Sequence, residues 1–354
     1  MLEGLLDRFG DGAVLMMAGA LVGFIFGAAA QHSRFCLRAA TVELSEGHSG
    51  SRLAIWLIAF SAAALCVQAA IASGVLDVSE ARQLAATGSL SGAVIGGLMF
   101  GAGMILARGC ASRLLVLSAT GNLRAILTGL VLTLVAQASL RGALSPAREA
   151  LSQLWLVPGG EARNLLMQLG LNARTAALAA GVVLVFAVVL ARRSQLQVTR
   201  ILGAATVGGA VALGWVLTYM IAQTSFEVVP VSSVTFTGPS TDTLMGLVNA
   251  SELPLSFGVG LVPGVFVGSG VMGLAAGEAR IERFGPDTPM ERYLVGAVLM
   301  GFGSMLAGGC AVGAGMSGGS IFAITAWVAV FCMWIGAMAT HRLMRAGHLA
   351  GRPI

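Results

Sequence analysis

Residues 98–112 read LMFGAGMILARGCAS, a glycine-rich apolar stretch that ends near a cysteine, and residues 298–312 read VLMGFGSMLAGGCAV. When residues 96–110 are aligned with 296–310 at a constant offset of 200, seven of the fifteen positions are identical. Glycine at the end of an apolar run interrupts a helix and exposes backbone N–H groups. The pattern predicts two helices that break at equivalent points, each followed by a short helix whose positively polarised N-terminus faces a thiol.

The bulk composition predicts a membrane protein. Of the 354 residues, 56% are hydrophobic and only 10% are charged, whereas soluble domains carry about a quarter charged residues. Every one of the 21 basic residues is arginine, which argues against an enzyme that depends on a lysine Schiff base. The formal net charge of +5 is explained by membrane topology, and we expect no nucleic-acid partner.

Long apolar runs predict how the chain crosses the bilayer. A helix needs about 20 residues to cross roughly 30 Å of hydrocarbon, and lipid admits only helices or closed barrels. The runs are continuous and do not alternate, so we expect an all-α, polytopic membrane protein whose residues 1–354 form a single transmembrane domain in membrane lipid. Nine spans are predicted, at roughly 12–31, 53–74, 90–109, 124–140, 174–191, 201–223, 257–276, 292–309 and 320–341.

The distribution of arginine predicts the orientation, because cytoplasmic loops retain positive charge. With an outside N-terminus and a cytoplasmic C-terminus, fifteen of the twenty-one arginines fall in inner segments. Residues 224–256 contain no arginine and are expected outside. Residues 141–173 are also expected outside although they contain Arg141, Arg148 and Arg163; their amphipathic pattern suggests a helix along the membrane interface.

The repeated motif predicts two halves of opposite orientation. Spans one to four, approximately residues 12–140, would correspond to spans six to nine, approximately residues 201–341, with 141–200 as the connection. A single connecting span turns the second half upside down. Inverted repeats of this kind place a substrate site near the bilayer midplane, between the halves.

Three of the five cysteines are candidates for function. Cys36, Cys110 and Cys310 stand where apolar runs break, whereas Cys66 and Cys332 lie in ordinary apolar segments and are expected to pack as small hydrophobic residues. There is no CxxC pair or His/Cys cluster with metal-ligand spacing, so we expect no metal, no cofactor and no catalytic residue. The predicted substrate pathway comprises Cys36, Cys110, Cys310, Gly109, Gly308, Gly309, Arg34 and Arg108.

Three segments carry a family resemblance: AAQHSRFCL at 29–37, LARGCAS at 106–112 and LAGGCAVGAGMSGGS at 306–320. Together they resemble the signature segments of the YeeE/YedE membrane family, and the resemblance covers essentially the whole hydrophobic chain. It implies an hourglass-like helical protein of the bacterial inner membrane that imports thiosulfate. It also implies that the anion passes Cys36, Cys110 and Cys310 in turn, held by S–H hydrogen bonds and short-helix N-termini, and that a small cytoplasmic sulfur-carrier protein is a partner.

The chain departs from the family pattern, and other functions stay open. Arg108 stands where the second half has Gly308, and residues 113–123 lack the dense glycines that follow Cys310. A membrane sulfurtransferase that forms a cysteine persulfide is one alternative, although His32 is the one base close in sequence to a candidate thiol. An importer of another sulfur or selenium oxyanion is the second. Span counting places Cys110 and Cys310 toward opposite sides, so the thiols approach the middle only if the helices that carry them are broken or re-entrant.

Overall fold

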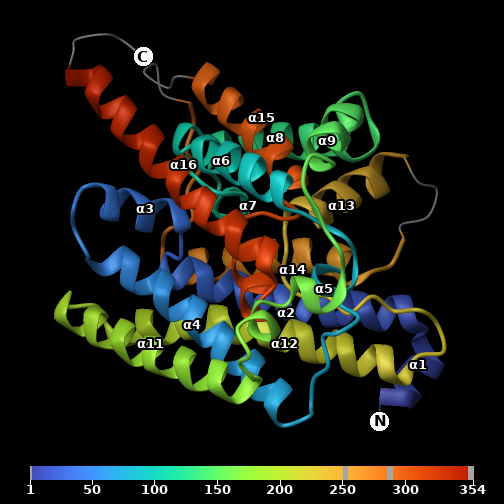
Figure 1. The fold of residues 1–354 in the computed structure, drawn as a ribbon. Coiled ribbons are helices and arrows are strands. Elements are labelled where there is room, and N and C mark those ends of the chain that lie inside the picture. Colours follow the sequence, from blue (N-terminus) through green and yellow to red (C-terminus); the bar gives the residue numbers. More distant parts are fainter. Residues whose placement is uncertain (1, 250–253, 285–289, 350–354) are drawn as a thin grey trace.

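The computed structural model describes residues 2–249, 254–284 and 290–349, and nearly all of its regular structure is helical (Figure 1). A long helix corresponds to each of the nine predicted spans. These helices are α2 (Asp11–Ser33), α4 (Ser51–Ala72), α6 (Leu90–Leu106), α8 (Leu123–Arg141), α11 (Ala173–Arg193), α12 (Val198–Thr224), α14 (Phe257–Ala275), α15 (Met290–Leu306) and α16 (Ile324–Leu349).

Short elements connect the long helices. Two-residue strands β1 (Gly88–Ser89) and β2 (Leu156–Val157) pair antiparallel. The short helices are α1 (Leu2–Phe9), α3 (Leu37–Ser45), α5 (Arg82–Ala85), α7 (Ala111–Ala119), α9 (Ser145–Ser152), the 3₁₀ helix η1 (Gly160–Arg163), α10 (Leu165–Gln168), α13 (Thr237–Asn249) and the π-helix η2 (Gly313–Gly318).

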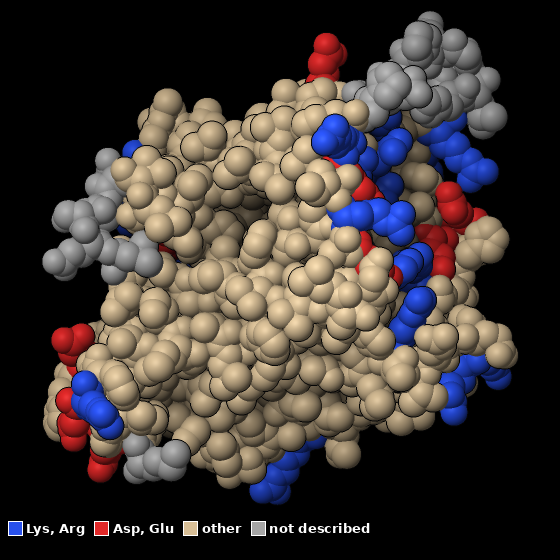
Figure 2. Space-filling model, turned by 180° about the vertical axis from the view of Figure 1, so that it is seen from behind, with Lys and Arg blue, Asp and Glu red and all other residues tan. Residues whose placement is uncertain are grey.

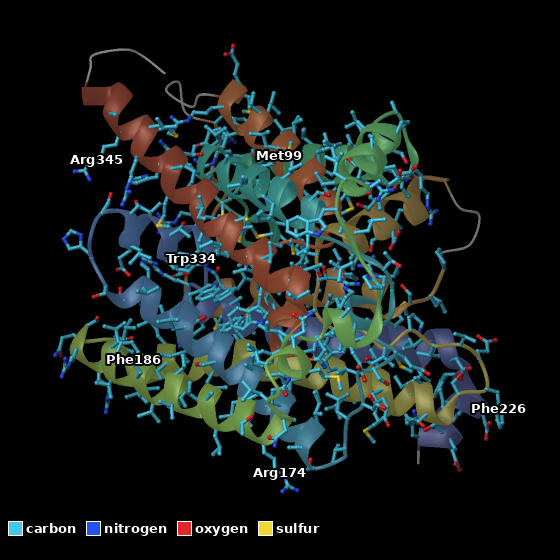
Figure 3. All side chains as sticks on the ribbon, viewed as in Figure 1. Met99, Arg174, Phe186, Phe226, Trp334 and Arg345 are labelled. Carbon is cyan, nitrogen blue, oxygen red and sulfur yellow. The ribbon has the colours of Figure 1, made fainter. Side chains whose placement is uncertain are left out.

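The protein is a polytopic helical membrane protein. Eight helical segments of the described chain are long and apolar enough to cross a bilayer. The ninth predicted span corresponds to α15, whose 17 residues rise about 25 Å, somewhat less than the hydrocarbon thickness. Apolar side chains also cover the outside of the bundle, as Phe186 on α11 illustrates in Figure 3 with an exposed fraction of 62%.

Glycines let α2 and α14 approach until their backbones touch. A Cβ atom built on Gly19 would lie 2.0 Å from the carbonyl oxygen of Phe257, and one on Gly260 would lie 1.9 Å from that of Met16. Gly23, Gly27, Gly264 and Gly268 meet the opposite backbone in the same way. Small residues at such spacing are the usual means of close helix packing in lipid.

The repeated motif forms a reciprocal contact between α6 and α15. A Cβ atom on Gly96 would lie 2.5 Å from the oxygen of Gly303, and one on Gly296 would lie 2.7 Å from the oxygen of Gly103. Adding 200 to Gly96 and subtracting 200 from Gly303 converts the first contact into the second. The two helices therefore cross antiparallel about a local two-fold axis. Other helix pairs show the same relation between the two parts of the chain. The contact of α2 with α14 is equivalent to that of α12 with α4, and the contact of α6 with α16 is equivalent to that of α15 with α8.

The two ends of the bundle differ in charge. Asp11 Oδ2 accepts a hydrogen bond of 2.6 Å from Ser225 Oγ, so the start of α2 and the end of α12 lie on the same side of the bundle. Arg34, at the other end of α2, lies on the opposite side. In Figure 2 most blue side chains gather along the right of the view, beside a broad uncharged surface. This agrees with the one-sided arginine distribution; Arg352 lies outside the described residues.

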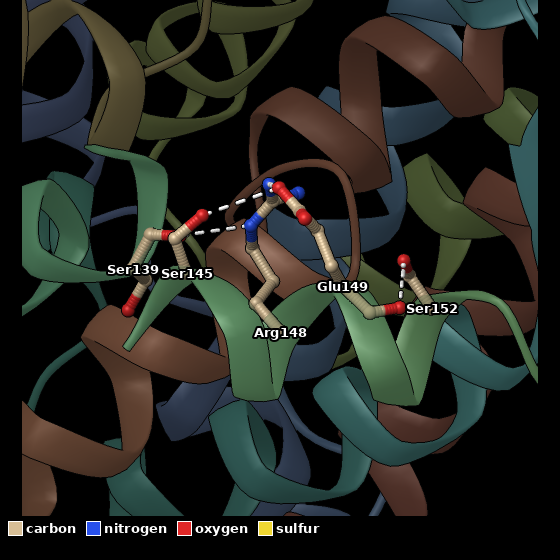
Figure 4. A network of polar contacts seen from close by, with 5 residues as sticks. All are labelled: Ser139, Ser145, Arg148, Glu149 and Ser152. Carbon is tan, nitrogen blue, oxygen red and sulfur yellow. Dashed lines mark hydrogen bonds and ion pairs between the residues drawn. The ribbon is translucent and has the colours of Figure 1, made fainter. Parts of the chain in front are cut away.

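Two segments between spans differ from expectation. The helix expected along the interface within 141–173 is not continuous: α9 already ends at Ser152 (Figure 4), and the chain continues as β2, η1 and α10. The segment 224–256 is more than a loop, since α13 folds back and packs against α8 and α14.

Candidate functional site

The three candidate cysteines lie in turns built in the same way. In each turn a long helix ends, and the residue two positions before the cysteine has a left-handed backbone. Its φ angle is 56° at Arg34, 53° at Arg108 and 77° at Gly308. The left-handed residue reverses the chain, so that the following residues start a new short helix.

A short helix follows each thiol. Cys36 and Cys110 are the N-cap residues of α3 and α7, and Cys310 precedes η2. The prediction that helices restart after Cys110 and Cys310 is confirmed, and α3 adds a third case that the sequence reasoning missed. The glycine-rich segment after Cys310 forms a π-helix, whereas the segment after Cys110 forms an ordinary α-helix.

Backbone amides face the sulfur atoms. The amide of Gly313 donates a hydrogen bond of 3.5 Å to Cys310 Sγ. The amides of Ala39 and Arg113, three residues after their cysteines, lie near the sulfurs of Cys36 and Cys110. Amides at a helix N-terminus carry partial positive charge, so each turn presents a thiol in surroundings that favour an anion.

The structure brings Cys36 and Cys110 together but places Cys310 elsewhere. The thiols of Cys36 and Cys110 are neighbours, and Cys110 Sγ also lies 3.3 Å from Ser112 Oγ. Gly96 packs against Ala307, close to Cys310. Gly96 and Ala107 are eleven positions apart along α6, which corresponds to a rise of about 16 Å. Cys310 therefore lies toward one side of the bundle, and the Cys36–Cys110 pair lies toward the arginine-rich side.

A polar network borders the Cys36–Cys110 pair. Arg34 Nη2 donates a hydrogen bond of 2.8 Å to Glu278, and Gln31 Nε2 donates one of 2.8 Å to the other oxygen of the same carboxylate. Arg113 Nη1 donates to Gln31 Oε1 at 3.3 Å and lies near both thiols. Gln31 and Glu278 were not predicted from the sequence as site residues. The available signal for Glu278 was the preceding glycine, which ends α14 in a left-handed turn.

Close neighbours leave no room for a side chain at two glycines around Cys310. A Cβ atom on Gly309 would lie 2.8 Å from the amide nitrogen of Ala314, and one on Gly313 would lie 2.1 Å from Thr235 Oγ1. Gly109 is less constrained, since the nearest atom to such a Cβ is a side-chain carbon of Leu114 at 3.2 Å.

Arg108→Gly is expected to stabilise the fold. A non-glycine residue in the left-handed region costs roughly 1–2 kcal/mol, and the Arg108 side chain is exposed. We expect a gain of about 1 kcal/mol, seen as a higher thermal midpoint in detergent, and a comparable loss for the reciprocal Gly308→Arg. An Arg108→Gly variant less stable than the parent would show that the arginine side chain makes a stabilising contact.

The Arg34–Glu278 pair predicts a pH effect. The hydrogen bond and charge of Arg34 lower the pKa of Glu278. A lowered carboxyl pKa in the folded state stabilises the protein above the ordinary pKa, and this contribution is lost as the pH falls through the lowered value. Both side chains are more than a third exposed, so we expect less than about 1 kcal/mol. The thermal midpoint of Glu278→Gln should fall below that of the parent near neutral pH and converge with it in acid, whereas the exposed control Glu80→Gln should follow the parent throughout.

Cys66 and Cys332 lie outside these turns, within the long helices α4 and α16. Cys66 is exposed on the surface of the bundle and Cys332 is buried. Cys332 packs beside Gly97 of α6. These positions suit the small hydrophobic role expected of them.

Comparisons with known proteins bear on the whole chain. The family model described as Sulphur transport matches residues 32–339. The thiosulfate transporter TsuA of Escherichia coli (strain K12) is 27% identical over 337 residues, which cover 91% of this chain and 91% of that protein. The thiosulfate transporter TsuA of Spirochaeta thermophila (strain ATCC 700085 / DSM 6578 / Z-1203) is 26% identical over 346 residues, covering 91% of this chain and 97% of that protein.

Proposed function

This chain belongs to the sulphur transport family, and from that premise we propose that it imports thiosulfate through a pathway lined by Cys36, Cys110 and Cys310. The observation that carries the proposal is the threefold occurrence of one device, a thiol at a helix break with backbone amides facing it. Two thiosulfate transporters are similar to this chain over nearly its full length.

The chemistry of the device suits transient binding of a dianion. An anion that leaves water must exchange its hydration shell for other donors. Thiols and backbone amides are uncharged donors, so they hold the ion less tightly than a bidentate arginine would. Conduction requires sites that bind well enough to admit the ion and weakly enough to release it. Gly109, Gly308 and Gly309 would keep the backbone at these turns open to the ion.

We propose that the two halves are inverted repeats. The reciprocal α6–α15 contact and the exchanged helix pairs support this arrangement. In such a repeat the ion would meet Cys310 on one side of the bundle and Cys110 with Cys36 on the other. The local two-fold axis would relate these two binding positions. Arg34 and Arg108 would attract the anion at the arginine-rich end.

We place that end in the cytoplasm, with the N-terminus outside and the protein in a bacterial inner membrane. The positive-inside rule supports this orientation. A small cytoplasmic sulfur-carrier protein that accepts the imported sulfur at this end stays a prediction.

We propose transport and not catalysis. A sulfurtransferase would use a cysteine thiolate to take the outer sulfur of thiosulfate and release sulfite, which requires a group to accept the thiol proton. Ser112 is the oxygen partner of Cys110 in the described structure, and a neutral hydroxyl is a poor base. Sulfur retained on the protein with release of sulfite would favour the enzyme.

The test of the proposed function is uptake of radiolabelled thiosulfate by proteoliposomes that contain the purified chain. We expect saturable uptake that unlabelled thiosulfate competes away, with weaker competition by sulfate and sulfite. Equal or stronger competition by another sulfur or selenium oxyanion would assign that anion as the substrate. No uptake above that of empty vesicles would contradict the proposal.

A further inference from the structure

Three buried phenylalanines from separate segments of the chain pack against one another inside the bundle. The ring centroids of Phe26 and Phe236 are 5.2 Å apart, and those of Phe26 and Phe35 are 6.4 Å apart with the rings edge to face at 82°. The exposed fractions of Phe26, Phe35 and Phe236 are 0%, 3% and 1%. These three side chains form one continuous apolar contact, which we call the phenylalanine cluster.

One end of the phenylalanine cluster adjoins the Cys36–Cys110 pair. Phe35 directly precedes Cys36 in the turn after α2. Phe26 stands on α2 eight positions before Arg34, which places it about 12 Å along the helix from the arginine-rich end. The cluster therefore extends from the thiol pair toward the middle of the bundle.

The other end of the phenylalanine cluster adjoins the Cys310 turn. Phe236 follows Thr235, and a Cβ atom on Gly313 would lie 2.1 Å from Thr235 Oγ1. The amide of Gly313 is the donor to Cys310 Sγ. A line of contacts thus leads from Cys310 through the three rings to Cys36.

Phe236 ends a segment that side-chain hydroxyls hold in place. Residues 225–236 form neither helix nor strand, and such backbone is tolerated at membrane depth only inside protein or beside a water-filled cavity. Ser317 Oγ of η2 donates a hydrogen bond of 2.6 Å to the oxygen of Val234, and Ser233 Oγ donates one of 2.6 Å to the oxygen of Val211. The position of Phe236 is therefore linked directly to the short helix that follows Cys310.

Two cavities meet the chain at Thr235 and Phe236. One has a volume of about 420 Å³, and its lining runs from Asp11, at the end of the bundle opposite the arginines, to Thr235. The other has a volume of about 360 Å³, and its lining includes Phe236 and Ala111, the residue after Cys110. The backbone at these two neighbouring residues thus forms part of the wall of both cavities.

Packed rings oppose the passage of a dianion. They offer no donor to replace the hydration shell, and a dry apolar constriction excludes ions. The cost is larger for sulfate, which is strongly hydrated through its oxygens, than for thiosulfate, which places part of its charge on a large polarisable sulfur. We propose that Phe26, Phe35 and Phe236 form a selectivity barrier between the two thiol positions, and that Phe236 determines which anions cross. This inference rests on the proposed function and adds to it the step between Cys310 and the Cys36–Cys110 pair.

Phe236→Ala tests the barrier in the proteoliposome uptake assay. Removal of the ring admits water between the thiol positions, which lowers the barrier most for the more strongly hydrated anion. We expect uptake of radiolabelled sulfate to rise roughly tenfold and uptake of thiosulfate to change by less than about threefold. Phe236→Leu retains apolar bulk and should keep the parent ratio of the two rates.

The matched control is Phe60→Ala, which removes a buried part of another aromatic group, packed on Trp56 and Trp327. This variant should keep the parent ratio of sulfate to thiosulfate uptake. A Phe236→Ala protein that is dispersed in size exclusion and keeps the parent ratio would overturn the proposal, as would an equal shift of the ratio in Phe60→Ala.

Access of a thiol reagent separates the barrier from transport. Right-side-out vesicles would carry a Cys66→Ala/Cys310→Ala protein, so that the exposed thiol and the thiol ahead of the barrier are absent. An anionic, membrane-impermeant methanethiosulfonate is added outside, and labelling of Cys36 and Cys110 is followed by mass spectrometry. We expect labelling roughly tenfold faster with Phe236→Ala in this background. Phe236→Val removes less volume, should give a smaller increase, and serves as the test if the alanine variant does not fold.

The outcomes of the labelling experiment distinguish the two proposals. An unchanged labelling rate in the folded Phe236 variants would refute the barrier even if the parent transports thiosulfate. Faster labelling in these variants without thiosulfate uptake by the parent would instead refute the transport proposal alone.

Discussion

Cys110→Ala and Cys310→Ala are each expected to lower the initial rate of thiosulfate uptake roughly 10- to 100-fold. A hydrogen bond to a charged group is worth about 1.5–3 kcal/mol, and each 1.36 kcal/mol corresponds to a tenfold change in rate. Both thiols are buried, so water does not readily replace the lost donor. Cys36 is only partly buried beside Cys110, and Cys36→Ala should have a smaller effect.

The measurement is uptake into proteoliposomes with matched protein content, after size exclusion has shown that each variant is folded. Cys66→Ala and Cys332→Ala are the controls, since one residue is exposed on the bundle surface and the other is buried outside the three turns. A folded Cys310→Ala protein with the parent rate would contradict the cysteine pathway. An equal loss of uptake in Cys332→Ala would show that general packing explains the effect.

Gly260→Ala is expected to have the largest effect on folding. The added Cβ atom would lie 1.9 Å from the Met16 carbonyl oxygen, which is backbone and cannot move aside as a side chain would. Overpacking typically costs about 1–3 kcal/mol where side chains adjust, and we expect about 3 kcal/mol or more here because α2 and α14 must separate.

The thermal midpoint in detergent and the fraction of dispersed protein in size exclusion report this change. Gly209→Ala in α12 is the matched control, because nothing lies within 4 Å of a Cβ atom at that position. There the substitution removes a helix-destabilising glycine and should stabilise the protein by roughly 0.5–1 kcal/mol. A Gly260→Ala protein as stable as the parent would show that the two helices are less tightly packed than the structure describes.

The sequence by itself determined the class of protein and the place of each long helix. Apolar runs of span length leave the chain no solvent but lipid, and lipid requires that backbone groups be paired within helices. The residues at 98–112 and 298–312 also predicted where two helices break, since a glycine beside the cysteine is a local signal. These features are encoded by neighbours in the chain.

Only the tertiary structure decided which residues meet. Glu278 and Gln31 border the Cys36–Cys110 pair, and their side chains bond to each other although they are 247 positions apart in the sequence. Arg148 and Arg163 are exceptions to the depletion of arginine in segments expected outside. The tertiary structure shows that they line one cavity with Arg82 and with residues beside Cys310. Local composition sets the hydrophobicity and breaks of a helix, but the position of a charge depends on how helices from both halves pack, and that packing is a property of the whole bundle.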